Sequence, residues 1–217
     1  MNILEKLDNC VFDKYEKRGG LGISEIGNPC RRYLWYKYNN VSSDKKPDSQ
    51  IIRIFNLGSS IESDLIADLK DAGFQITCEQ AECKTFLNLD AGFGHIYGHI
   101  DGIIEYDGDS HILEIKSAND ASFRRLKKCQ SYEIWQPKYK AQIQGYMHAT
   151  DVHDAIVIVY NKNNSELYSE KIEYDFNYMT ALLKFVTDSV TAASAPQLFC
   201  GDKMAKYCEY QELCYGK

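Results

Sequence analysis

Residues 98–116 read GHIDGIIEYDGDSHILEIK and predict a β-hairpin, around which the rest of the chain can be arranged. Isoleucine, leucine and tyrosine dominate its two arms, Tyr97–Tyr106 and Ser110–Ser117. Asp107-Gly108 lies between the arms and is a favoured two-residue turn, in which both residues have positive φ. A hairpin closed by this turn has Tyr106 facing Asp109, and this pair fixes the register of both arms.

The register places two acidic side chains opposite each other. Asp101 faces Glu114, with Cβ atoms about 4.5–5.5 Å apart, and Lys116 points to the same face as Glu114. Two carboxylates this close repel each other unless a positive charge lies between them, and a divalent cation supplies one. A solvated polar face is the alternative, because antiparallel sheets often have one. Apolar residues on both faces of the hairpin favour the cation site.

Asp101, followed by Glu114-x-Lys116 on the next strand, resembles the active-site core of the PD-(D/E)XK nuclease superfamily. Ile100 stands where that family often has proline. The resemblance implies hydrolysis of DNA phosphodiester bonds with Mg²⁺ or Mn²⁺. It further implies that Asp101, Glu114 and the backbone carbonyl of Ile115 hold the metal, and that Lys116 positions or activates the attacking water.

A long helix is predicted upstream of the hairpin, because residues 48–72 carry apolar side chains at helical spacing. It contains Gly58-Ser-Ser-Ile-Glu62. This segment resembles the Gly-x-x-x-His motif of RecB-like nucleases, in which the histidine contacts the metal. Glutamate is an oxygen ligand for hard cations, so the resemblance implies a third ligand at Glu62. The alternative is that Glu62 is an ordinary exposed residue of the helix.

Two segments downstream of the hairpin bear on DNA binding. Gln142 and Tyr146 lie one helical turn apart and resemble the Gln-x-x-x-Tyr motif, which in RecB-like nucleases flanks the site and contacts DNA. Residues 116–140 hold seven basic and two acidic residues with interleaved aromatics, although the whole chain has a net charge of −6. Such a segment favours single strands; a solvated helix face with buried aromatics is the alternative. The predicted DNA-binding residues are Arg124, Arg125, Lys127, Lys128 and Tyr139.

The chain has eight cysteines and neither a signal-peptide core nor an apolar stretch long enough for a membrane span. We therefore expect a cytoplasmic protein in which cysteines bind a metal or cluster rather than form disulfides. Zinc and iron–sulfur binding are both compatible with four thiolates.

One cysteine near the N-terminus and three near the C-terminus resemble the iron–sulfur branch of the RecB-like nucleases. That branch includes the AddB nuclease domain and the CRISPR-associated Cas-four-type exonucleases. The resemblance implies a [4Fe–4S] cluster on Cys30, Cys200, Cys208 and Cys214, although the gap between Cys200 and Cys208 is longer than in the family's tight pairs. The remaining cysteines are expected to be free thiols; they are Cys10, Cys78, Cys83 and Cys129.

The whole chain is predicted to be a single α/β domain of the restriction-endonuclease-like type, with a mixed central sheet flanked by helices. Its nuclease core covers about residues 49–190, and an iron–sulfur lobe combines about 24–38 with 195–217. A flexible segment is expected over 39–49. The predicted helices are 2–18, 24–38, 49–72, 120–129, 138–149 and 176–193, and the predicted strands are 74–83, 97–106, 110–117, 155–160 and 165–174.

The sequence thus predicts a metal-dependent DNA exonuclease that acts on single strands or DNA ends. An endonuclease of the same fold and a non-catalytic iron–sulfur DNA-binding adaptor are the alternatives. DNA is the expected partner, a homo-oligomer or CRISPR and recombination proteins are possible further partners, and no membrane association is expected. Phage recombination, DNA repair and CRISPR adaptation in antiviral defence all stay open as pathways.

Overall fold

The computed structural model describes residues 2–13, 19–43, 47–89, 92–200, 205 and 208–216. Residues 14–18 of the first predicted helix and the middle of the segment predicted to be flexible lie outside these ranges. None of the described helices is long and apolar enough to cross a membrane.

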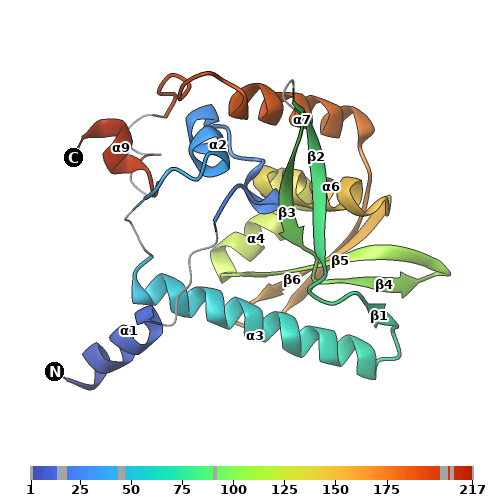
Figure 1. The fold of residues 1–217 in the computed structure, drawn as a ribbon. Coiled ribbons are helices and arrows are strands. Elements are labelled where there is room, and N and C mark those ends of the chain that lie inside the picture. Colours follow the sequence, from blue (N-terminus) through green and yellow to red (C-terminus); the bar gives the residue numbers. More distant parts are fainter. Residues whose placement is uncertain are drawn as a thin grey trace.

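A five-stranded mixed sheet forms the centre of the fold (Figure 1). Its strand order is β1-β4-β5-β6-β7, in which β5 and β6 are parallel and the other neighbours are antiparallel. The connection between the parallel pair contains three helices, as a parallel crossover requires. The strands are β1 (Ile76–Thr77), β4 (Gly102–Tyr106), β5 (Asp109–Ala118), β6 (Asp154–Asn161) and β7 (Leu167–Glu173).

The predicted hairpin is β4 and β5. Asp107 and Gly108 have φ values of 54° and 89°, as the predicted turn requires, and Tyr106 lies opposite Asp109. The pairing ends at Gly102 and Leu113, however, so the predicted pair of Asp101 with Glu114 across the hairpin is wrong. The chain bends at Asp101, whose carboxylate instead accepts a hydrogen bond from the backbone N–H of Ile115 at 2.7 Å.

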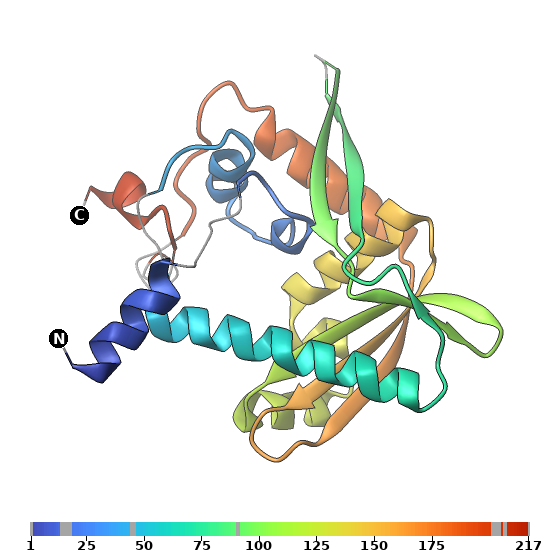
Figure 2. The same ribbon diagram turned by 60° about the horizontal axis from the view of Figure 1, so that its bottom comes forward.

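A second hairpin, β2 (Glu82–Leu89) and β3 (Gly92–His99), projects from the central sheet as a separate ribbon (Figures 1 and 2). This ribbon lies outside the predicted elements for most of its length. The predicted strand over residues 74–83 is wrong for most of that range, because only 76–77 and 82–83 are extended. Cys78 and Gln80 both have positive φ. This backbone conformation is incompatible with an extended strand, so the chain turns between β1 and β2.

Gly98 in β3 allows a close approach that a larger residue would prevent. A Cβ atom at this position would lie 2.5 Å from Cε1 of Tyr146 and 3.1 Å from Cβ of Ile23. We expect Gly98→Ala to displace Tyr146 and to lower the free energy of unfolding by about 1–3 kcal/mol through overpacking. Urea denaturation measures the loss. Gly108→Ala is the comparison, because Gly108 has a positive φ but no neighbouring atom within 4 Å, so its substitution causes backbone strain without overpacking. Equal stability of Gly98→Ala and the wild type would contradict this packing.

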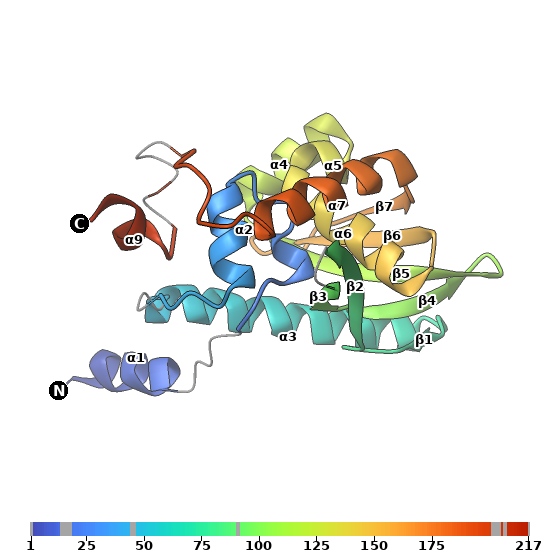
Figure 3. The same ribbon diagram turned by 45° about the horizontal axis from the view of Figure 1, so that its top comes forward.

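Helices cover both faces of the sheet (Figures 1 and 3). The long helix α3 (Ser49–Asp71) lies on one face, where Leu65 and Ile66 pack with Leu113 and Ile115 of β5. The other face packs in a larger core, to which Ile112 and Ala118 of β5 contribute. This alternation is what a strand buried on both sides requires. The helices on this second face are α4 (Asp120–Cys129), α5 (Tyr132–Trp135), α6 (Pro137–Thr150) and α7 (Phe176–Val190).

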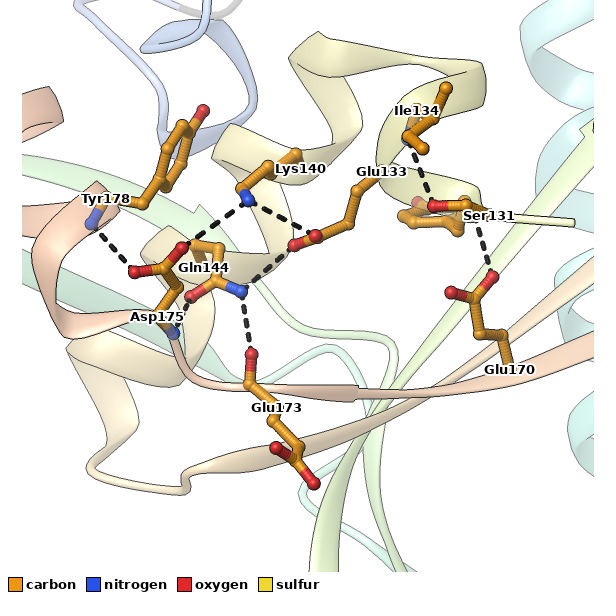
Figure 4. Close-up of polar contacts among 10 residues, drawn as sticks. Ser131, Glu133, Ile134, Lys140, Gln144, Glu170, Glu173, Asp175 and Tyr178 are labelled. Carbon is orange, nitrogen blue, oxygen red and sulfur yellow. Dashed lines mark hydrogen bonds and ion pairs between the residues drawn. The ribbon is translucent and has the colours of Figure 1, made fainter. Parts of the chain in front are cut away.

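Polar contacts fix α6 against α5, β7 and the start of α7 (Figure 4). Lys140 lies 3.2 Å from Glu133 and 3.6 Å from Asp175. Gln144 is fully buried; it donates to the carbonyl of Glu173 at 2.9 Å and accepts from the N–H of Asp175 at 2.7 Å. These contacts hold in place the helix that carries Tyr139, Gln142 and Tyr146.

The two ends of the chain meet in a lobe beside the core. Arg32 Nε donates to the carbonyl of Pro196 at 2.6 Å, and the rings of Tyr33 and Tyr210 lie 5.7 Å apart. The predicted helix over residues 24–38 starts only at Arg31, after Pro29, because a proline disfavours helical backbone angles at the residue before it. The elements of the terminal regions are α1 (Ile3–Asp13), the 3-10 helix η1 (Ile23–Glu25), α2 (Arg31–Tyr38) and α9 (Gln211–Tyr215).

Candidate active site

Glu114 and Lys116 lie on the inner face of β5, between the sheet and α6. Glu114 is fully buried, and one of its oxygens, Oε1, contacts the ammonium of Lys116. Its other oxygen, Oε2, is buried and has no hydrogen-bond partner among the described residues. A buried carboxylate oxygen without a partner is costly. This atom is therefore a position at which a bound cation would be favourable.

Asp101 approaches the same place from the bend before β4. The side chain of Asp101 is buried. Its carboxylate accepts the hydrogen bond from the Ile115 N–H that a backbone carbonyl would accept if β4 continued alongside β5. Since the N–H and C=O of a strand residue point to the same edge, the Ile115 carbonyl is directed to the edge beyond the end of β4. The predicted carbonyl ligand thus lies beside the two predicted carboxylate ligands.

Glu62 reaches this group from α3 on the opposite face of the sheet. Its carboxylate accepts a hydrogen bond from the side chain of Gln80. Burial raises the pKa of Glu62 to about 7, and the nearby negative charge of Asp101 adds to the increase. The structure therefore brings Glu62 close to Asp101 and Lys116, and it is more buried than an ordinary exposed helix residue.

The electrostatics of the group follow from burial and mutual proximity. Burial raises the pKa of Glu114 to about 7 against the opposing effect of Lys116, and burial also raises the pKa of Asp101. Burial disfavours the charged form of Lys116, but Glu114 and Asp101 outweigh it and raise the pKa of the lysine. Such perturbed groups are typical of functional sites.

These shifts predict a pH dependence of stability for the metal-free protein. Glu62 and Glu114 bind protons more tightly in the folded chain than in the unfolded chain, whose glutamates titrate near 4.5. Between pH 4.5 and about 7 the folded state therefore holds more protons, and their contribution to stability is lost as pH rises. We expect Glu114→Gln, which does not titrate, to gain stability relative to the wild type across this window.

Urea denaturation at several pH values in a chelator measures this difference. Subtracting the stability of the wild type from that of Glu114→Gln at each pH removes the contributions of the other carboxylates. A difference that stays constant from pH 4.5 to 7.5 would contradict the raised pKa of Glu114.

Helix α6 supplies the remaining predicted residues. Gln142 Nε2 donates to the hydroxyl of Tyr146 at 3.1 Å, and both side chains are buried. Burial raises the pKa of Tyr146, and Glu114 adds to the increase, so the hydroxyl lies within electrostatic reach of the acids. The ring of Tyr139 lies 5.7 Å from Lys116 Nζ and 5.1 Å from Lys138 Nζ. The structure therefore gathers the predicted catalytic and metal-binding residues and Tyr139 in one region.

The chemistry of this donor set fits Mg²⁺ or Mn²⁺. Carboxylates and a backbone carbonyl are hard oxygen donors, and the unpartnered Oε2 of Glu114 needs a positive charge. Within the described ranges, no three His, Cys, Asp or Glu side chains converge closely enough to hold a metal ion. The acids instead bond to the Lys116 ammonium, the Gln80 amide and the Ile115 N–H.

Four basic residues of the predicted segment lie on the outer face of α4; they are Arg124, Arg125, Lys127 and Lys128. Phe123 and Leu126 face the core, and the basic side chains are exposed. Arg124 lies 2.8 Å from Asp120, and Lys127 lies 3.3 Å from Glu166. DNA binding by Arg124, Arg125, Lys127 and Lys128 stays a prediction, and these ion pairs reduce the charge that two of them offer to phosphate.

The four cysteines of the terminal lobe lie near one another. Cys30 is buried at the start of α2; burial raises the pKa of its thiol, and the adjacent Cys200 adds to the increase. Burial likewise raises the pKa of Cys208, with contributions from Cys214, Cys200 and Cys30. None of the four forms a disulfide. In the part of the lobe that the structure describes, they do not form a closed metal-binding group.

Sequence reasoning missed three residues beside the site. Gln80 holds Glu62 from a turn that has no hydrophobic periodicity. Tyr132 is fully buried, stacks on Tyr139 and has a hydroxyl with no partner among the described groups. Cys83 is buried, and the pKa of its thiol is raised to about 11, first by burial and then by Glu114. The aromatic content of residues 123–139 was the one available signal, and it pointed to Tyr132.

Residues 74–153 match the YqaJ-like viral recombinase domain family. This range runs from just before β1 to just before β6 and contains Asp101, Glu114, Lys116, Gln142 and Tyr146. Among curated proteins, no significant match is found.

Solved structures share the fold at low sequence identity. The protein SSO0001 is 15% identical with a TM-score of 0.61, over 99% of this chain and 97% of that chain. The alkaline exonuclease LHK-Exo from Laribacter hongkongensis is 16% identical with a TM-score of 0.54, over 86% of this chain and 90% of that chain. LHK-Exo in complex with dAMP has the same identity and coverage and a TM-score of 0.51. The predicted mixed α/β fold with a helix-flanked sheet is confirmed, and it is consistent with a restriction-endonuclease-like fold.

Proposed function

We propose that this protein is a metal-dependent DNA exonuclease that hydrolyses phosphodiester bonds at single strands or DNA ends. The observation that carries the proposal is the meeting of Asp101, Glu114 and Lys116 at the end of β5, with one buried Glu114 oxygen left unpartnered. The recombinase-family match over the same residues and the likeness to an alkaline exonuclease support it.

In this proposal Asp101, Glu114 and Glu62, with the Ile115 carbonyl, would hold Mg²⁺ or Mn²⁺. The ion would supply charge stabilisation to the phosphate that is attacked. Lys116 stays protonated beside the acids, so its role is to orient water and to stabilise negative charge with its ammonium. Gln142 and Tyr146 keep their mutual hydrogen bond, with the Tyr146 hydroxyl within electrostatic reach of Glu114. Tyr139 lies at Lys116, where it can stack on a base.

We further propose that the chain is a single domain with a nuclease core over about residues 49–190. The lobe of about residues 24–38 and 195–217 would hold a structural [4Fe–4S] cluster on Cys30, Cys200, Cys208 and Cys214. Support comes from the contact between the two chain ends and from the proximity of the four free thiols. The cluster is assigned no part in hydrolysis.

The decisive experiment incubates anaerobically purified protein with end-labelled single- and double-stranded DNA, with Mg²⁺, with Mn²⁺ or with EDTA. We expect nucleotides or short products to be released from linear DNA only when the metal is present. A covalently closed circle of the same sequence is the control and should survive. Cutting of the circle would favour the endonuclease alternative, and no cleavage of any substrate would contradict the proposed function.

A further inference from the structure

Tyr132 brings a buried hydroxyl to the face of the sheet that carries Glu114. The residue is fully buried, and its hydroxyl has no hydrogen-bond partner among the described residues. A phenylalanine would fill the same space without this polar atom. Because a buried hydroxyl without a partner destabilises the folded state, its presence points to a role other than packing.

Strand pairing relates the position of Tyr132 to that of Glu114. Glu114 of β5 pairs with Val157 of β6, and Val157 pairs with Glu170 of β7, so the three form one row across the sheet. Neighbouring strands lie about 4.8 Å apart, which separates the backbones of Glu114 and Glu170 by roughly 10 Å. The backbone N–H of Tyr132 donates to the Glu170 carboxylate at 2.7 Å. The backbone of Tyr132 is therefore held at the β7 end of this row.

Two further observations show that the ring extends along the row toward the site. Tyr132 stacks on Tyr139 with ring centroids 5.7 Å apart, and the Tyr139 ring lies 5.7 Å from Lys116 Nζ. Burial raises the pKa of Tyr132, and the negative charge of Glu114 contributes most of the remaining increase. The hydroxyl thus lies within electrostatic reach of Glu114 on the β7 side, whereas Asp101 lies beyond the end of β4 on the other side of β5.

We propose that Tyr132 is a positioning residue whose hydroxyl donates a hydrogen bond, directly or through one water, to the Glu114 carboxylate when the cation is bound. This inference rests on the proposed function. One Glu114 oxygen contacts Lys116, and the other has no partner among the described residues. A donor on the β7 side fixes the rotation of this carboxylate. Groups that orient a ligand in this way raise metal affinity without touching the metal.

Tyr132→Phe tests this role, because it removes the hydroxyl and keeps the ring. Binding of Mn²⁺ to the protein without DNA is followed by the electron paramagnetic resonance signal of the free ion. We expect the dissociation constant to rise about tenfold. In EDTA the variant should resist urea at least as well as the wild type, since the hydroxyl that it lacks has no partner there. Easier unfolding of the variant in EDTA would show a purely structural role for the hydroxyl and would overturn the proposal.

Tyr174→Phe is the matched control, because the Tyr174 hydroxyl bonds to His148 at 2.8 Å, four residues beyond Glu170 along the chain. It should bind Mn²⁺ as the wild type does. Equal Mn²⁺ affinities of Tyr132→Phe and the wild type, or equal losses in the two variants, would overturn the proposal. A wild type that binds no Mn²⁺ would contradict the metal site of the proposed function and this inference with it. A wild type that binds Mn²⁺ but leaves DNA intact would contradict the nuclease activity alone.

Discussion

Glu114→Gln is expected to abolish DNA cleavage, with a loss of about 10³-fold or more, while the protein stays folded. The change keeps the shape of the side chain and removes its charge. It therefore weakens metal binding at the buried oxygen that has no other partner and deprives Lys116 of its ion pair. Initial cleavage rates on end-labelled DNA give the loss, and circular dichroism reports the fold.

Glu105→Gln is the matched control for this prediction. Glu105 lies in the same hairpin, but its carboxylate bonds to Ser110 at the exposed end and not to the site. It should cleave DNA as the wild type does. Asp101→Asn and Lys116→Ala should each cause losses comparable to that of Glu114→Gln, and a double variant should lose little more, because the three groups act as one unit. Near wild-type cleavage by Glu114→Gln would remove β5 from the active site.

Cys30→Ala is expected to lower the melting temperature by about 10 °C, as a loss of a few kcal/mol does in a domain of this size, and to remove iron from anaerobically purified protein. Cys30 is buried where α2 begins and lies beside Cys200, so a cluster held there would join the two chain ends. A group bound only by the folded state contributes its binding free energy to stability. The measurements are iron content, visible absorbance and thermal unfolding.

Cys129→Ala provides the comparison, because Cys129 is exposed at the end of α4, away from the lobe. It should keep the iron content and melting temperature of the wild type. Stoichiometric zinc without iron in the anaerobic protein would replace the cluster by a structural zinc site. A wild type that contains neither iron nor zinc would show that hydrogen bonds and aromatic contacts alone hold the lobe together.

The parts of the fold that the sequence predicts well are those with strong local signals. The hairpin was found because Asp107-Gly108 allows one register, and α3 was found because its apolar side chains recur over six turns. The ribbon of β2 and β3 was missed because three glycines and two histidines interrupt the apolar pattern of β3. Apart from one bridge between Tyr97 and Gly22, its strands pair with each other and not with the central sheet, so the strand pattern of the sheet does not extend to them.

The candidate site was predicted in its members but not in its geometry. The sequence predicts Asp101 as a paired residue of the β4–β5 ladder. The alternation of side chains along a strand does not reveal that the ladder ends at Gly102, one residue short of Asp101. Gln80 was missed because its role depends on a left-handed turn that a non-glycine residue rarely adopts. Tyr132 belongs to a helix of one turn, which is too short to produce a periodic pattern.

The meeting of the two chain ends has a consequence for the order of events during biosynthesis. The residues of the candidate site lie between Glu62 and Tyr146, whereas Arg32 of the lobe bonds to Pro196, 164 positions later. Closing so long a loop costs more entropy than closing the hairpin, and it must wait until the ribosome has released the distal segment. The catalytic hairpin can therefore form while α2 still lacks its partner. We expect a nascent chain whose emerged part ends after β7 and before α7 to protect β5 from protease while α2, whose Arg31 packs on Phe185 of α7, remains open to digestion.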